Sequence, residues 1–310
     1  MSGVVRIATR RSPLALWQAE HVAGRLAAAH PGLATRLVPI VTEGDRIQDR
    51  SLATVGGKGL FIKELESALL AGDADIAVHS MKDVPADMPQ GLGIAVVLER
   101  ADPCDALVAN GVASFRELPP GARVGTSSLR RQCQIRRARP DVSVIVLRGN
   151  VDTRLRKLDA GEFDATILAM AGLERLGLTR RVRERLSPRQ MLPAVGQGVI
   201  GIECRVADSR IRDLLIPLEH YPTRLVLDAE RAFAARLGGG CQSPIAAHAE
   251  LAGESVSLRG LVGAPDGSMV YEDRITGPAR ESAALGTRLA VRLMEAGAAA
   301  LLAELAAGAH

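Results

Sequence analysis

Val-Val-Arg-Ile-Ala-Thr-Arg-Arg-Ser-Pro, residues 4–13, is the stretch that decides the fold class of this chain. Its first five residues are mostly apolar or β-branched and predict a strand. Ser12-Pro13 then supplies an N-cap and a first-turn proline for a helix that we expect to run to about Ala29. Further strands are predicted at 35–41, 76–79 and 92–98, with a helix near 60–71. This alternation favours an α/β domain with a largely parallel sheet.

The same alternation starts again after residue 100. Strands are predicted at 106–108, 123–125 and 142–147, and helices near 128–137 and 151–158. Arg123-Val-Gly-Thr126 resembles Arg6-Ile-Ala-Thr9, and each ends a strand just before a helix capped by serine. We therefore expect two α/β domains of similar design that face each other.

The last third of the chain follows a different pattern. The glycine-rich segment 195–201 leads into an apolar strand that we expect to return to the first sheet. From about Tyr221 the sequence predicts a helix to Leu237, two strands around the Asp266-Gly267 turn and one long helix over 279–306. This indicates a smaller C-terminal α+β domain. The expected boundaries are 1–99 with 194–217 for domain 1, 100–193 for domain 2, and 218–310 for domain 3.

Composition narrows the function classes. A chain of 310 residues that is 47% hydrophobic and 24% charged is typical of a globular protein with two or three cores. It has no run of 18 uncharged apolar residues and no apolar signal region, so we expect a cytoplasmic protein without a membrane partner. The net charge of +4 could suggest nucleic acid, but four Phe, two Tyr and one Trp leave few platforms for stacking bases. The four cysteines form no CxxC pair, so neither a metal site nor a disulfide framework is expected.

Three strand-to-helix turns carry hydroxyl and guanidinium side chains. They are Thr-Arg-Arg-Ser at 9–12, Thr-Ser-Ser-Leu-Arg-Arg at 126–131, and Leu-Arg-Gly-Asn at 147–150, followed by Arg154. Helix N-termini offer N–H groups to anions, and arginine there opposes the helix dipole unless an anion binds. Only four of the 39 basic residues are lysine, so arginine richness alone carries little information. Any one of these turns could hold only caps and solvated arginines, but three at equivalent strand ends favour a polyanionic ligand.

The segment His79-Ser-Met-Lys-Asp-Val-Pro85 ends an apolar strand and turns abruptly polar. This places Lys82 and Asp83 at the edge of the sheet where ligands bind in open α/β folds. Asp83 either holds N–H donors and steadies a developing cation, or it merely caps the turn or pairs with Lys82. Spacing alone leaves both interpretations open. We expect His79 to be a half-buried strand residue and not a catalytic base.

Two glycine-rich loops also stand out. Gly56–Phe61 lacks the upstream glycine of a P-loop and the Ser/Thr after Lys58, so we expect a lid and not a nucleotide site. Gly-Gly-Gly-Cys-Gln-Ser-Pro, residues 238–244, is expected to form a loop that exposes the Cys241 thiol. It is a better nucleophile candidate than the other three cysteines, which we expect to be buried. No His or Asn partner is close in sequence, but a thiol that forms one lasting bond needs none.

Together, seven ordered motifs of this chain resemble the porphobilinogen deaminase family. They lie at 6–18, 57–64, 79–85, 125–131, 147–154, 193–198 and 239–242. The resemblance implies two α/β domains similar to type II periplasmic binding proteins, and a third domain whose loop cysteine carries a dipyrromethane cofactor. One departure is Ser243, where an apolar residue such as Val is expected.

The resemblance also implies an activity and residue roles. Enzymes of this family join four porphobilinogen molecules head to tail, release ammonia and give hydroxymethylbilane. Cys241 would hold the dipyrromethane through a thioether, and Asp83 would bind pyrrole N–H groups during the reaction. Cofactor carboxylates would be bound by Lys82, Thr126, Ser128, Arg130, Arg131 and Arg154. Incoming substrate would be bound by Arg10, Ser12, Gln18, Arg148 and Arg175. A monomer is expected.

The main rival is a non-catalytic small-anion-binding protein, because the same two-domain architecture also serves as a ligand trap. A third domain that offers Cys241 to the cleft counts against that reading, as does the lack of an export signal.

Overall fold

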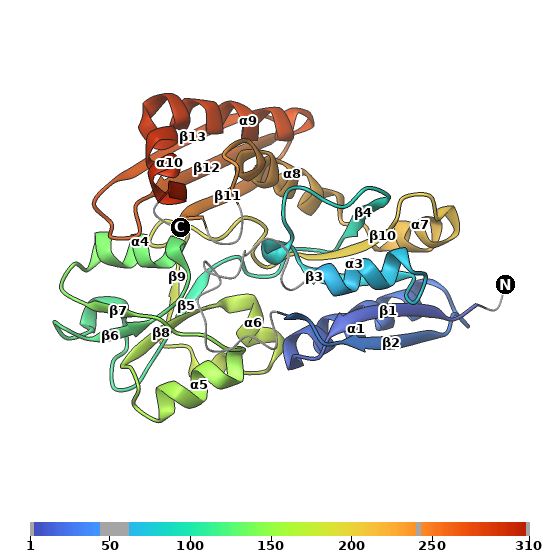
Figure 1. Ribbon diagram of the computed structural model, residues 1–310, viewed down its shortest axis with the longest axis horizontal. Helices are drawn as coiled ribbons and strands as arrows, with labels where there is room; N and C mark the ends of the chain where they lie inside the picture. Colours follow the sequence, from blue (N-terminus) through green and yellow to red (C-terminus); the bar gives the residue numbers. More distant parts are fainter. Residues whose placement is uncertain (1–2, 44–61, 240–242, 308–310) are drawn as a thin grey trace.

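The computed structural model describes residues 3–43, 62–239 and 243–307, and Figure 1 shows the three sheets of this part of the chain. The first sheet has the strand order β2-β1-β3-β10-β4. Strand β1 pairs parallel with β2 and β3, whereas β10 pairs antiparallel with β3 and β4. Only β10 therefore runs against the others. The bounds are β1 Val5–Arg10, β2 Thr35–Ile40, β3 Ile76–Ser80, β4 Leu92–Val97 and β10 Ile200–Arg205.

The second sheet repeats this design. Its order is β7-β6-β8-β5-β9, and β5 pairs antiparallel with β8 and β9. The reversed strand is thus the fourth in both sheets, and in both it is the first strand after the chain crosses from the other unit. The prediction of two α/β units of similar design is confirmed. The bounds are β5 Asp105–Ala109, β6 Arg123–Gly125, β7 Ser143–Ile145, β8 Ala165–Ala169 and β9 Glu184–Leu186.

Helices pack on both faces of each of these sheets. In the first unit, Leu26 of α1 belongs to the same apolar cluster as Ile202, whereas Leu69 of α3 packs with Ala8 on the opposite face. In the second unit, α4 and α5 divide between the two faces in the same way. The bounds are α1 Pro13–Ala29, α3 Lys63–Leu70, α4 Leu129–Ala138, α5 Val151–Asp159, α6 Met170–Arg175 and α7 Ser209–Leu215.

The third unit is an antiparallel sheet of order β11-β12-β13 covered on one face by α8 and α9 (Figure 1). The predicted smaller α+β unit is confirmed, as are the two strands around the Asp266-Gly267 turn, but residues 245–252 form a further strand that was not predicted. Its Ala-rich sequence has low strand propensity, and it becomes a strand by pairing along its whole length with β12. The bounds are β11 Ile245–Ala252, β12 Ser255–Gly263, β13 Val270–Pro278, α8 Tyr221–Arg236, α9 Ser282–Leu293 and α10 Ala299–Ala307.

The prediction of a single helix over 279–306 is wrong. A π-helical turn, Met294–Ala298, separates α9 from α10, and Gly297 within it has a φ of 121°. A Cβ at this position would lie 2.7 Å from Tyr271 Oη of β13. Only glycine combines this backbone conformation with such close approach of an aromatic side chain, so the helix breaks here.

The chain passes between the first two units twice, at 98–104 and 193–199, and the two crossings pack side by side. Ala101 N donates to Gly198 O at 3.2 Å, and Arg100 Nε donates to Gln197 O at 2.9 Å. The fully buried Glu230 of α8 contacts both crossings. It accepts from Arg100 Nη1 at 2.6 Å and from Gly196 N at 2.8 Å. Glu230 therefore joins both crossings to the third unit.

Gly198→Ala is expected to destabilise the protein more than Gly121→Ala. Both glycines have positive φ, of 87° and 78°, so both variants carry a strain of about 1–2 kcal/mol. A Cβ at 198 would lie 2.6 Å from Ala101 O, whereas nothing lies within 4 Å of one at 121. This clash between the crossings should cost a further 1–3 kcal/mol or so. Urea unfolding measures the difference, and equal losses would show that the crossings are not closely packed.

Candidate active site

Asp83 lies in the short 3₁₀ helix η2 (Met81–Asp83) that directly follows β3. Two side chains from other elements hold this segment. Gln18 Nε2 of α1 donates to Ser80 Oγ at 2.8 Å. On the other side, Arg231 of α8 donates to the carbonyl oxygens of the two residues after Asp83, at 3.1 and 2.8 Å. The Asp83 segment is thus fixed from both the first and the third unit.

His79 has a structural environment. It is 5% exposed, and its Nε2 lies 2.8 Å from Oε2 of Glu203 on the neighbouring strand β10. Since successive strand residues point to opposite faces of a sheet, His79 and Ser80 project on different sides. His79 is more deeply buried than expected, and its contact is with Glu203.

The N-terminus of α4 is organised by its own hydroxyl groups. Ser128 is the N-cap, and its Oγ accepts from Arg131 N at 3.4 Å. The buried Thr126 Oγ1 accepts from Ser128 N at 3.2 Å. In both bonds the hydroxyl is the acceptor, and a hydroxyl that accepts a hydrogen bond can still donate its own hydrogen.

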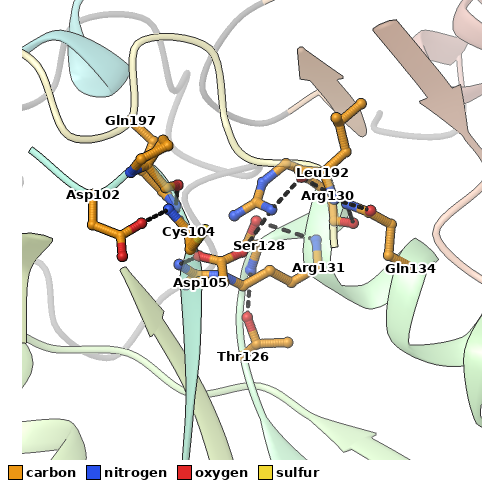
Figure 2. Close-up of polar contacts among 11 residues, drawn as sticks. Asp102, Cys104, Asp105, Thr126, Ser128, Arg130, Arg131, Gln134, Leu192 and Gln197 are labelled. Carbon is orange, nitrogen blue, oxygen red and sulfur yellow. Dashed lines mark hydrogen bonds and ion pairs between the residues drawn. The ribbon is translucent and has the colours of Figure 1, made fainter. Parts of the chain in front are cut away.

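Arg130 and Arg131 turn from this helix start to one buried carboxylate, that of Asp105 (Figure 2). Arg130 Nη1 donates to Asp105 Oδ2 at 2.8 Å, and Arg131 Nη2 donates to Oδ1 at 2.6 Å. Gln197 Nε2 donates to Oδ1 at 3.0 Å from the second crossing. The two arginines predicted to bind an anionic ligand therefore already share one internal anion.

The positive side chains near Asp83 come from both α/β units, and they affect one another's ionisation. Burial lowers the pKa of Lys82 to about 8; the Asp83 carboxylate opposes this shift and Arg131 adds to it. The pKa of Arg154 is lowered to about 10, mainly by burial and also by Arg131 and Arg148, whereas Asp83 opposes the shift. We call Lys82, Arg131, Arg148 and Arg154 the cationic cluster. The structure brings it together beside Asp83.

A cavity lies next to the cationic cluster, between η2, the start of α4 and the end of α8. Its lining includes Lys82, Ser128, Arg130, Arg231, Gly239 and Ser243. Gly239 and Ser243 flank residues 240–242, so Cys241, expected to carry the cofactor, lies outside the described residues. The same is true of Lys58 in the expected lid. The other three cysteines are buried, as predicted.

The residues expected to bind substrate lie on several elements of the first and second units. Arg10 ends β1, and Ser12 Oγ caps α1 by accepting from Ala15 N at 3.3 Å. Arg175 has a different environment from the cationic cluster. Its Nη2 donates to Gly198 O at 2.7 Å, and its guanidinium lies 5.7 Å from the ring centre of Trp17. Arg175 thus connects α6 of the second unit with α1 and the second crossing, and burial lowers its pKa to about 10.

Asp105, Gln197 and Arg231 were not predicted as site residues. For Asp105 the sequence held a usable signal, because an acidic residue inside the apolar run Cys-Asp-Ala-Leu-Val-Ala (104–109) requires a buried partner. For Arg231 the sequence held no such signal, because its partners are the backbone carbonyl oxygens of residues 84 and 85, which are far from it in the chain.

Comparison with known families decides the identity of this architecture. The family model described as porphobilinogen deaminase, dipyromethane cofactor binding domain, matches residues 5–213. The chain belongs to the porphobilinogen deaminase family. A second model of this family, its C-terminal domain, matches residues 225–295. The porphobilinogen deaminase matches thus include the cationic cluster, Asp83 and most of the third unit.

Solved structures that resemble this chain include three bacterial proteins. The BvgS periplasmic VFT2 domain of Bordetella pertussis is 16% identical, with a TM-score of 0.42 over 68% of this chain and 85% of its own. A putative methionine-binding lipoprotein of Bacillus subtilis is 14% identical, with a TM-score of 0.44 over 70% and 90%. The aliphatic sulphonate binding protein SsuA of Escherichia coli is 14% identical, with a TM-score of 0.41 over 76% and 70%.

The residues present fit the cofactor of the porphobilinogen deaminase family. Dipyrromethane carries acetate and propionate groups, so it needs cationic donors. Nε of Arg131 and Nε of Arg148 are buried and have no hydrogen-bond partner within the described part of the chain. A buried donor without a partner is costly unless a ligand satisfies it. These two atoms belong to the cationic cluster, where a carboxylate of the cofactor would satisfy Arg131 Nε and a carboxylate of the substrate would satisfy Arg148 Nε.

Among the helices of the described ranges, none combines the length and apolarity needed to span a bilayer.

Proposed function

We propose that this chain is a porphobilinogen deaminase, a transferase that joins four porphobilinogen molecules head to tail and releases hydroxymethylbilane. The observation that carries the proposal is the cationic cluster beside the Asp83 carboxylate. A growing chain of pyrroles that each carry an acetate and a propionate is a polyanion. Such a ligand matches a cleft with several converging arginines.

The chemistry of each round is a substitution at the aminomethyl carbon of porphobilinogen. The C–N bond breaks, and ammonia leaves with the bonding electrons. The freed methylene carbon bonds to the open α carbon of the terminal pyrrole, which then loses a proton. Four substrates and one water give one hydroxymethylbilane and four ammonia. When bound, the dipyrromethane supplies the first terminal pyrrole.

Asp83 is assigned the electrostatic role in this reaction. Positive charge develops on the substrate's pyrrole ring as ammonia leaves, and a carboxylate beside the ring nitrogen stabilises it. The effect requires a carboxylate that is already in place before the reaction. The Gln18–Ser80 hydrogen bond and the Arg231 contacts to the following carbonyls hold the Asp83 segment in this way.

The binding roles are those that the family resemblance implies. Cofactor carboxylates are assigned to Lys82, Thr126, Ser128, Arg130, Arg131 and Arg154, and a thioether to Cys241. Substrate carboxylates are assigned to Arg10, Ser12, Gln18, Arg148 and Arg175. Arg175 retains further guanidinium N–H groups beyond the one that binds Gly198 O. The expected domain boundaries, cytoplasmic location and monomeric state are part of the same proposal and rest on the family resemblance.

The rate of this reaction should fall as the pH rises through the pKa of Lys82. Lys82 has a pKa of about 8 without ligand, so its charge is present below that pH and is lost above it. A bound anion favours the protonated form and moves the decline upward. In a profile of kcat/KM against pH, the alkaline limb should therefore begin at or above pH 8. Lys82→Arg should shift this limb to higher pH, because arginine stays protonated.

The control for this profile is Lys63→Arg, since Lys63 is exposed at the start of α3. The Lys63→Arg control should show the same alkaline limb of kcat/KM as the wild type. If Lys82→Arg also keeps it, Lys82 does not supply the titrating charge.

The proposed function is tested by incubating the purified chain with porphobilinogen and measuring both products. Ammonia and hydroxymethylbilane should appear in a ratio of four to one. Binding of porphobilinogen without ammonia release would instead establish the anion-binding reading and reject the enzyme.

A further inference from the structure

Asp105 is a buried acid at the point where three parts of the structure meet. It is fully buried at the start of β5, the reversed strand that follows the first crossing. Its two carboxylate oxygens accept from Arg130, Arg131 and Gln197 at 2.6–3.0 Å. Burial alone would raise the pKa of Asp105, but the two guanidinium groups hold it well below the usual range. Asp105 is therefore an anion at all physiological pH values.

The geometry of the two arginines requires such an anchor. Arg130 and Arg131 are neighbours in the first turn of α4, and adjacent helical residues do not normally point the same way. Cations in the first turn of a helix are also disfavoured by the helix dipole. Here both converge on one carboxylate, as Figure 2 shows, so Asp105 overcomes both tendencies.

The same carboxylate is tied to both crossings between the α/β units. Gln197 Nε2 donates to Asp105 and also to Pro103 O at 2.7 Å. Arg130 Nη1 donates to Leu192 O at 2.8 Å as well as to Asp105. The arginines are consequently fixed relative to the crossings, and not only relative to their own helix.

One donor of this arrangement is left for a ligand. Arg131 uses Nη2 for Asp105, whereas its buried Nε has no hydrogen-bond partner among residues 3–43, 62–239 and 243–307. A guanidinium that is hydrogen-bonded through one nitrogen, and has an N–H group without a partner at another, is oriented to bind an incoming carboxylate.

We propose that Asp105 is a positioning residue of the anion site. It holds Arg130 and Arg131 in the orientation in which they receive cofactor carboxylates, and it couples that orientation through Gln197 to the chain crossings. Asp105 does not itself touch the ligand. This inference rests on the proposed function, since it assumes that the ligand is the covalent cofactor and its extended chain.

The test uses the full chain as wild type, Asp105→Asn and Asp102→Asn. Asparagine keeps the shape of aspartate and removes its charge. Asp102 is the matched control, because it lies on the same crossing and pairs with the exposed Arg185 outside the cluster. The readouts are the fraction of chains with a covalent adduct by intact mass, the melting temperature, and KM separately from kcat.

Asp105→Asn is expected to lower the rate of adduct formation with added porphobilinogen by about 10- to 100-fold, as misplaced binding groups do. Any chains that carry the adduct should show a raised KM. Asp102→Asn should match the wild type in adduct formation and in KM. A folded Asp105→Asn variant with wild-type loading and wild-type KM overturns the inference and leaves the proposed function standing. A wild type that never gains the adduct removes the proposed function, and the inference with it.

If Asp105→Asn does not fold, the Gln197→Met variant tests the positioning role of Asp105 instead. This variant keeps the ion pairs of Asp105 and removes only the hydrogen bonds from the second crossing. A positioning role predicts a KM raised about threefold or more with kcat nearly unchanged. A lowered melting temperature with unchanged KM would mean that the Asp105 cluster is purely structural, and this outcome also overturns the inference.

Discussion

The Asp83→Glu variant should keep its cofactor and lose about 100- to 1,000-fold in turnover. Glutamate preserves the charge, but its extra methylene moves the carboxylate relative to the pyrrole nitrogen. The segment cannot easily shift to compensate, because Arg231 holds the two carbonyls that follow Asp83. Electrostatic stabilisation depends on a prepositioned charge, so misplacement is expected to lower kcat much more than it raises KM.

Asp87→Glu is the matched control for this variant, since Asp87 is exposed and lies four positions further along the same loop. It should retain wild-type kcat. Intact mass measured on the same samples separates a defect in turnover from a defect in cofactor attachment. Near-normal kcat in a fully loaded Asp83→Glu variant would remove Asp83 from the reaction.

The second large effect concerns stability. Glu230→Gln should lower the free energy of unfolding at neutral pH by about 3–5 kcal/mol, because it leaves Arg100 buried without its counter-charge. Glu230 is fully buried and accepts from Arg100, Gly196 N and Ala249 N. Loss of the Glu230 carboxylate therefore weakens the hydrogen bonds that join both crossings to β11. Urea unfolding at pH 7 measures the change.

This effect should depend on pH with a defined sign. Burial raises the pKa of Glu230, but Arg100 and His248 outweigh burial and bring the pKa to about 2, below the ordinary 4.5. A depressed pKa stabilises the fold above the unfolded value and loses that contribution as the pH falls towards the folded value. The difference between wild type and Glu230→Gln should thus be largest at neutral pH and shrink below about pH 4.

Glu250→Gln is the control for the stability measurement. Glu250 lies on the adjoining strand β11, and its side chain is 68% exposed. Its replacement should change the free energy of unfolding by less than about 0.5 kcal/mol. If Glu230→Gln is no more destabilising than this control, the buried junction does not hold the three units together.

Features set by neighbouring residues were predictable from the sequence. Ser12-Pro13 defines the start of α1, and the side-chain oxygens of Ser128 and Asn150 cap α4 and α5 as their positions suggested. The gathering of Lys82 and Asp83 with Arg131, Arg148 and Arg154 was also predictable, because strand ends in an open sheet meet at one edge. These inferences needed only local chemistry and the topology of the fold.

Features set by distant partners were not predictable. Strand β11 looks helical by composition and exists because β12 pairs with it. The break at Gly297 depends on the ring of Tyr271, which is distant in the chain. The shared carboxylate of Asp105 receives its donors from 25, 26 and 92 positions away. Sequence periodicity carries no information about such contacts.

Intact-protein mass spectrometry of the wild type beside Cys241→Ser tests the central claim most directly. If the chain is a porphobilinogen deaminase primed by its own cofactor, the wild type carries the added mass of one dipyrromethane and the Cys241→Ser variant carries none. A wild type that is unmodified and stays unmodified after incubation with porphobilinogen would contradict the account.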